Sequence, residues 1–169
     1  MFKFLLVLIF SIVLLFFPKS NLLAQQNKFV DVNPDSLVNF AKKFIGTPYL
    51  WAGETPKGFD CSGFVYYVYK HFGVETTHNS SDFPLFGLPV SIDSSKTGDI
   101  ILFTGENSKS KKIGHAGIII SKFGEPLTFI QSSSSKKHNG VVITDYIKSH
   151  YKNRFIGVIR LTKTESIIN

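Results

Sequence analysis

The sequence predicts an α+β domain in which two N-terminal helices pack on one face of an antiparallel sheet of five to six strands. The prediction depends on order, because the helical patterns precede residue 74 and the strand patterns follow residue 98. Helices first and strands second are typical of an α+β domain. With 169 residues the chain has room for one ordinary domain. We expect that domain at 35–162, between a lead-in at 25–34 and a tail at 163–169.

The first 24 residues have the pattern of a secretory signal peptide. Lys3 precedes an apolar run at 4–17, in which Ser11 is the one polar residue, and the small Ala24 suits a cleavage site. The run of 14 residues is shorter than the roughly 20 that span a bilayer. We therefore expect residues 1–24 to be removed and the product to reach the periplasm, the cell wall or the medium without a stable membrane span. An uncleaved membrane anchor is the alternative.

Two helical patterns follow. In the first, at 33–46, Pro34 suits the first helical position and apolar residues recur at helical spacing. A loop rich in turn formers at 47–60 leads to the second pattern, CSGFVYYVYKHFG, which starts at Cys61 and ends at Gly73. Cys61 is therefore expected at the N-terminus of the second helix.

Short strands are predicted after a polar connection at 74–98, where β-branched and aromatic runs alternate with turn residues. The expected strands lie at 99–103, 115–120, 127–131, 141–144 and 155–161. Residues 145–152 could form a short helix, and no internal repeat is present.

The charge of the chain limits its partners. Without residues 1–24 it carries 17 Lys and Arg against 12 Asp and Glu, a net charge of +5. For an exported protein this surplus favours lipid headgroups or wall polymers, although a generally solvated Lys-rich surface explains it equally well. Nucleic acid is not an expected partner, because the basic residues are scattered and no zinc-finger, recognition-helix or aromatic RNA-binding motif occurs.

Cys61 is the only cysteine, so no internal disulfide can form. A helix N-terminus lowers the pKa of a thiol, as a nucleophile requires, and its free N–H groups, that of Cys61 included, can stabilise an oxyanion. Gly63 keeps the first turn small, which leaves room for a substrate backbone or simply for packing. A buried and inert cysteine is the alternative.

Five histidines compete for the role of base, and His115 is the candidate. It begins the apolar strand HAGIII, where a sheet can hold its ring and exclude water. His71 lies about 15 Å along the helix from Cys61 and cannot reach it. The other three lie in polar connections and are expected to be exposed: His78, His138 and His150. Gln131 ends the apolar strand LTFIQ, where it either accepts the second imidazole N–H or faces solvent.

Five ordered blocks, TPYLWAG, GFDCSGFV, KTGDIILF, GHAGIII and FIQSSS, resemble the NlpC-type family of papain-like cell-wall cysteine peptidases across residues 35–161. The resemblance implies a papain-like fold, a catalytic triad of Cys61, His115 and Gln131, and peptidoglycan stem peptides as substrate. It implies no metal and no organic cofactor, and we expect a monomer.

The resemblance also implies roles for residues around the nucleophile. The hydroxyl of Tyr49 would lie near the oxyanion site, and Asp60 and Ser62 would line the substrate subsite. Ordinary aromatic packing of Tyr49 and Trp51, and an N-cap role for Asp60, are the alternatives.

The chain departs from the family pattern at three places. Ala52 stands where many relatives have glycine, Gln131 stands where histidine is commoner, and the stretch ETTHNSSDF has no arginine after the nucleophile helix. Glutamine supplies a hydrogen bond without a charge, and the missing arginine bears on how the carboxylates of a stem peptide are recognised.

We expect a thiol endopeptidase that acts through a thioester on Cys61, with His115 protonating the leaving amine. The resemblance implies the γ-D-glutamyl to diamino acid bond as the one cut, because many relatives cut it, and a crosslink, which other relatives cut, is the alternative bond. An amidase or acyltransferase of the same fold is one alternative. A catalytically silent wall-binding domain is the other.

Overall fold

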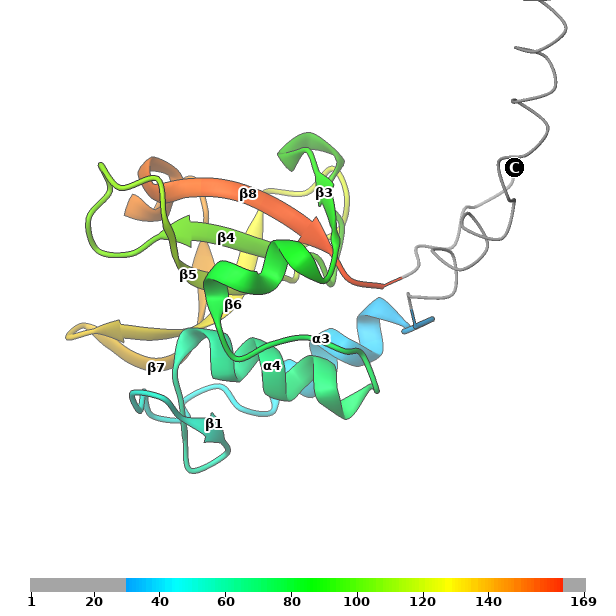
Figure 1. The fold of residues 1–169 in the computed structure, drawn as a ribbon, viewed down its shortest axis with the longest axis horizontal. Helices are drawn as coiled ribbons and strands as arrows, with labels where there is room; N and C mark the ends of the chain where they lie inside the picture. The colour runs from blue at the N-terminus through cyan, green and yellow to red at the C-terminus, as the bar shows by residue number, and fades with distance from the viewer. Residues whose placement is uncertain (1–29, 163–169) are drawn as a thin grey trace, which may run out of the picture.

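The computed structural model describes residues 30–162 and shows two α-helices on one face of a six-stranded antiparallel sheet (Figure 1). Helix α3 spans Pro34–Lys42 and helix α4 spans Cys61–His71. The strands of the sheet are β3 Leu88–Val90, β4 Ile100–Thr104, β5 Ile113–Ile119, β6 Thr128–Ser135, β7 His138–Asp145 and β8 Phe155–Arg160. Their order in the sheet is β3-β8-β4-β5-β6-β7. The predicted α+β fold is confirmed.

The two ends of the described chain meet in an isolated parallel bridge between Val30 and Thr162. The predicted signal peptide at 1–24, the first half of the lead-in and the predicted tail at 163–169 lie outside the described residues. Between residues 30 and 162 there is no helix of the length and apolarity needed to cross a membrane.

Helix α3 begins with an N-cap at Asn33, whose side chain accepts a hydrogen bond of 2.9 Å from the amide of Ser36. It ends at Lys42, four residues before the predicted end, and the chain continues as turns to Gly46. There the amide of Gly46 donates to the carbonyl of Val141 over 2.9 Å. This bond ties the start of the loop that precedes α4 to strand β7.

Helix α4 supplies much of the core on the helical side of the sheet. Its fully buried apolar side chains are those of Phe64, Val65, Val68 and Tyr69. They belong to one cluster with alternate residues of the strands, including Leu102, Ala116 and Ile130. Burying each of these aliphatic or aromatic side chains stabilises the fold by about 1.5–3 kcal/mol. The helix packs on β5 and β6, so its first residue is held against the strands that carry His115 and Gln131.

The other face of the sheet carries a second, smaller core. Ile101 and Phe103 of β4 point into it together with Phe129 of β6. Tyr151 covers this cluster from the 3-10 helix η4, which spans His150–Arg154. The alternation of the two faces along β4 is the period of two that the strand pattern predicts.

The structure also differs from the prediction in several elements. A hairpin of β1 (Glu54–Thr55) and β2 (Gly58–Phe59) lies in the expected loop, and β3 lies in the expected polar connection. That connection also holds the 3-10 helices η2 (Ser80–Leu85) and η3 (Ile92–Ser94). These pieces are too short to produce a periodic pattern.

Two predicted boundaries were wrong. Strand β6 continues through Ser132–Ser135, and β7 already begins at His138, although the sequence places both stretches in a connection. Eight residue pairs join β6 and β7, so cross-strand pairing outweighs the weak strand preference of serine. The expected short helix at 145–152 is replaced by η4, whose five residues lie further along the chain.

Candidate active site

The loop that carries Tyr49 is held by backbone hydrogen bonds to the segment just before α4. The amide of Phe59 donates to the carbonyl of Pro48 over 3.1 Å, and the amide of Asp60 donates to the carbonyl of Gly53 over 2.9 Å. Tyr49 is half-buried in this loop, and burial followed by the charge of Cys61 raises the pKa of its hydroxyl. The hydroxyl is therefore protonated at neutral pH and able to donate a hydrogen bond near the sulfur.

Trp51 and Ala52 at the tip of the same loop behave differently from Tyr49. Trp51 is 83% exposed, so the interpretation of Trp51 as packing against the loop is wrong. Ala52 has a positive φ of 56°, a left-handed conformation that glycine adopts more easily. This backbone requirement explains why a glycine suits the position that Ala52 occupies.

Cys61 is the first residue of α4 and is partly exposed. Burial of its side chain, and then the charge of Asp60, raise the pKa of the thiol, while hydrogen bonds from the amides of Ala116, Ser62 and Cys61 act in the opposite direction. The expectation that the helix N-terminus leaves Cys61 with a lowered pKa is wrong, because burial outweighs the amides. At neutral pH the thiol keeps its proton and needs a base to become a nucleophile.

His115 is the third residue of β5, which begins at Ile113 and not at the predicted 115, and only 7% of its surface is exposed. Its Nε2 hydrogen-bonds to Oε1 of Gln131, whose Nε2 in turn donates to the hydroxyl of Thr144 over 2.8 Å. Gln131 is 1% exposed, so the alternative in which it faces solvent is wrong. Because Gln131 accepts from Nε2, Nδ1 of His115 is left free to take a proton.

The electrostatics of His115 make it a neutral base. Burial first, and then the charges of Arg154 and His150, lower its pKa to about 4, although the hydrogen bond with Gln131 acts in the opposite direction. Between residues 30 and 162 no hydrogen bond joins Cys61 to His115. The sulfur instead meets β5 at the amide of Ala116, the next residue along the strand. Thiol and imidazole are therefore neighbours, both uncharged at neutral pH.

Asp60 holds together the start of α4. As N-cap it accepts 2.7 Å from the amide of Gly63 and 3.1 Å from the hydroxyl of Ser62. It also accepts 3.0 Å from Nε2 of His78, whose Nδ1 lies 3.3 Å from Glu54 Oε2. The N-cap role considered for Asp60 is thus present in the structure. The expectation that His78 is an exposed side chain is wrong, since its side chain is 28% exposed and lies between two carboxylates.

Gly63 allows this close assembly. A Cβ on Gly63 would lie 2.0 Å from the carbonyl oxygen of Gly53 and 2.8 Å from Nε2 of His78. Gly63 was expected either to leave room for a substrate backbone or to allow close packing. The structure supports close packing, because a side chain at this position would contact the Gly53 loop and not an open cleft.

Tyr151 and Arg154 were missed by sequence reasoning. The ring of Tyr151 stacks on that of His115 with centroids 5.2 Å apart, and the guanidinium carbon of Arg154 lies 5.0 Å from the Tyr151 ring centroid. Burial raises the pKa of Tyr151, whereas hydrogen bonds with Gln131 and Ser133 oppose that rise. The stretch YKNR at 151–154 has no periodic pattern, and its only signal is one aromatic residue beside two basic residues. The two remaining histidines, His138 and His150, are exposed as expected.

A partly exposed cysteine at the start of a helix, packed on a sheet that buries a histidine and its polar partner, is the architecture of papain-like cysteine hydrolases. The NlpC/P60 family model matches residues 46–160. The probable peptidoglycan endopeptidase LytE of Bacillus subtilis (strain 168) is 36% identical over 130 residues, 76% of this chain and 35% of that protein. The gamma-D-glutamyl-L-lysine dipeptidyl-peptidase of Bacillus cereus is 35% identical over 95 residues, 56% of this chain and 28% of that protein.

Solved structures agree with this match. The crystal structure of an NlpC/P60 family protein from Bacillus cereus superposes with a TM-score of 0.69 at 29% identity, covering 80% of this chain and 42% of that one. The chain belongs to the NlpC/P60 family, a family of cysteine peptidases with peptidoglycan endopeptidases among its members. The family resemblance stated from the five motifs is confirmed. The chain spans about a third of the length of the curated relatives it matches.

Proposed function

We propose that this chain is an exported cysteine peptidase that hydrolyses amide bonds in the stem peptides of peptidoglycan, with Cys61, His115 and Gln131 as its catalytic triad. The observation that carries the proposal is the buried pair of His115 and Gln131 on β5 and β6, beside the sulfur of Cys61. Two relatives named for peptidoglycan or γ-glutamyl peptide cleavage support the substrate class. Export rests on the apolar run at 4–17, and the proposed catalytic domain is 35–162.

The proposed reaction begins from the neutral pair. Nδ1 of His115 takes the proton of the Cys61 thiol as the sulfur attacks the amide carbonyl. The amide of Cys61 and the hydroxyl of Tyr49 donate to the resulting oxyanion. His115 then gives its proton to the leaving amine, and water hydrolyses the thioester. Gln131 keeps the imidazole in the tautomer that this sequence requires.

The proposed bond is the one between γ-D-glutamate and the diamino acid of the stem. The name of the Bacillus cereus relative points to this class of bond. Asp60 and Ser62 are proposed to line the subsite for the acyl part, since both lie in the first turn beside the nucleophile.

A digestion of purified sacculi with product identification by mass spectrometry tests the proposal. Wild-type protein is expected to release stem-peptide fragments whose new amino terminus is the diamino acid, whereas Cys61→Ala and His115→Gln release none. Ser134→Ala, an exposed change on β6, is the control and keeps full activity. Undiminished release by Cys61→Ala would contradict the assignment, and a transferred acyl group in the products would identify an acyltransferase.

A second candidate function is a wall-binding domain without catalysis. It is favoured by the raised pKa of Cys61 and by the lack of a hydrogen bond between Cys61 and His115 in the described part of the chain. Sedimentation with sacculi separates the two functions, because a binding domain pellets with the wall and releases no fragment from it.

A further inference from the structure

We infer that Ser132 is a positioning residue, whose hydroxyl holds Cys61 beside His115 for the transfer of the thiol proton. This inference rests on the proposed function and adds to it a residue that acts through the backbone. Ser132 is fully buried in β6, and its hydroxyl donates to the carbonyl of Phe59 over 2.7 Å. Phe59 lies 73 residues away along the chain and immediately precedes Asp60, the N-cap of the nucleophile helix.

Strands β5 and β6 separate beside the site, so backbone pairing alone does not fix its parts. Within residues 30–162 the pairing of these strands ends at Ile118 and Ile130 on the side of the site. Beyond that pair the side chains of His115 and Gln131 bridge the two strands. Ser132 directly follows Gln131, and adjacent side chains of a strand point to opposite faces of the sheet. Neighbouring residues of β6 therefore hold the imidazole on one side and the segment before α4 on the other.

The carbonyl of Phe59 is a junction between three parts of the site. Besides the hydroxyl of Ser132, it accepts a hydrogen bond of 3.1 Å from the amide of Leu50. Leu50 follows Tyr49, so one oxygen joins strand β6, the segment before Cys61 and the loop that carries the proposed oxyanion donor. Removing the hydroxyl of Ser132 leaves the bond from Leu50 in place. Such a change therefore releases the nucleophile segment from β6 and keeps it attached to the Tyr49 loop.

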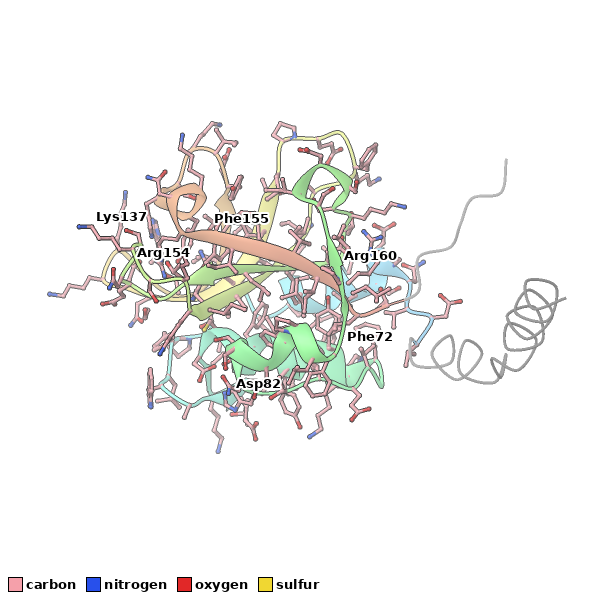
Figure 2. All side chains as sticks on the ribbon, turned by 45° about the horizontal axis from the view of Figure 1, so that its top comes forward. Phe72, Asp82, Lys137, Arg154, Phe155 and Arg160 are labelled. Atoms are coloured by element: carbon pink, nitrogen blue, oxygen red, sulfur yellow. The ribbon has the colours of Figure 1, made fainter. Side chains whose placement is uncertain are left out.

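The directions of α4 and β6 agree with this role. Figure 2 shows Lys137, in the turn between β6 and β7, and Phe72, the C-cap of α4, at opposite ends of the domain. The start of α4 therefore lies toward the end of the domain that carries this turn, as Figure 1 also shows. Ser132 lies on the stretch of β6 that leads into the turn. The serine-rich run that the sequence placed in a connection thus reaches the segment that begins the nucleophile helix.

Steady-state kinetics on the soluble peptide L-Ala-γ-D-Glu-L-Lys-D-Ala test the role of Ser132. Ser132→Ala is expected to lower kcat by about tenfold or more and to change KM by less than about twofold, because a shift of about 1 Å between reacting groups can cost about 100-fold in rate. Ser121→Ala is the matched control. Ser121 is also buried, and its hydroxyl also makes one hydrogen bond to the backbone, from the amide of Thr128 over 3.2 Å. Equal kcat values for the two variants overturn the inference.

Alkylation of Cys61, the only cysteine, by iodoacetamide separates failure of this inference from failure of the proposed function, because it needs no hydrolysis. The sulfur displaces iodide and its proton passes to His115, so His115→Gln is expected to slow the reaction about tenfold or more at neutral pH. In Ser132→Ala protein the same change should slow it by less than about twofold. An equal factor in both backgrounds overturns the inference and leaves the proposed function standing. No slowing by His115→Gln alone contradicts the triad, and the inference with it.

Discussion

Nε2 of His78 lies 3.0 Å from Oδ2 and 3.1 Å from Oδ1 of Asp60, the residue that precedes the proposed nucleophile and caps its helix. The opposite ring nitrogen faces Glu54 at 3.3 Å. The ring of His78 thus lies between two carboxylates, one of which caps the helix of the proposed nucleophile. His78 also lies in the stretch after α4 where the sequence has no arginine. His78 therefore holds the carboxylate beside Cys61 in place.

Replacing His78 by Gln is expected to lower kcat/KM by about tenfold, because Asp60 loses a charge-assisted partner and the first turn of α4 loosens. His78→Arg should recover most of the activity, since a guanidinium can reach the same carboxylates. Steady-state kinetics on the wild type and both variants measure the effect. Equal kcat/KM for the wild type and His78→Gln would show that the contact between His78 and Asp60 plays no part in activity.

Tyr151 is expected to position His115 through its ring more than through its hydroxyl. Tyr151→Leu removes the ring that stacks on the imidazole and should lower the free energy of unfolding by about 2 kcal/mol and kcat by a larger factor than KM. Tyr151→Phe keeps the ring and should cost about 1 kcal/mol for the lost hydrogen bonds. Urea denaturation and steady-state kinetics on both variants test this, and equal kcat values would contradict a positioning role.

The pH dependence of stability is expected to report His115. Its pKa is lowered from 6.5 to about 4 in the folded protein, chiefly by burial, so the unfolded chain binds the proton more tightly. The contribution of neutral, buried His115 to the free energy of unfolding is therefore fully present above about pH 6.5. It is lost as the pH falls toward 4. The free energy of unfolding of the wild type should drop by about 2–3 kcal/mol more than that of His115→Gln between about pH 7 and pH 4.5.

Denaturant titrations of both proteins at the two pH values give this difference. Other titrating groups are common to both proteins and cancel. Parallel pH curves for wild type and variant would mean that the imidazole is not buried as a neutral group.

Gly63→Ala is expected to destabilise the protein by more than about 2 kcal/mol, because its Cβ would meet the backbone carbonyl of Gly53 at 2.0 Å. Gly157→Ala is the matched control, since a Cβ there meets nothing within 4 Å. Thermal unfolding of the two variants makes the comparison. If both changes had equal effects, the close approach of α4 to the Gly53 loop would be disproved.

The order of residues along the chain was enough for the fold class and for several side chains of the site. The start of α4 at Cys61, the polar Gln131 at the end of an apolar run and His115 at the head of a strand are local signals of capping and periodicity. The five-block motif pattern gave the family, which the comparisons confirmed. These features depend only on residues that are neighbours along the chain, so they can be recognised from a single sequence.

Contacts between distant segments could not be read in this way. His78 meets Asp60 from 18 residues away, and Tyr151 covers His115 from 36 residues away. The raised pKa of Cys61 likewise depends on how deeply the packed domain buries the thiol, and a helix-end argument alone gave the opposite direction. Burial and long-range pairing arise only when helices and sheet pack together, so the packing of the domain decides the charge state of the thiol and of the imidazole.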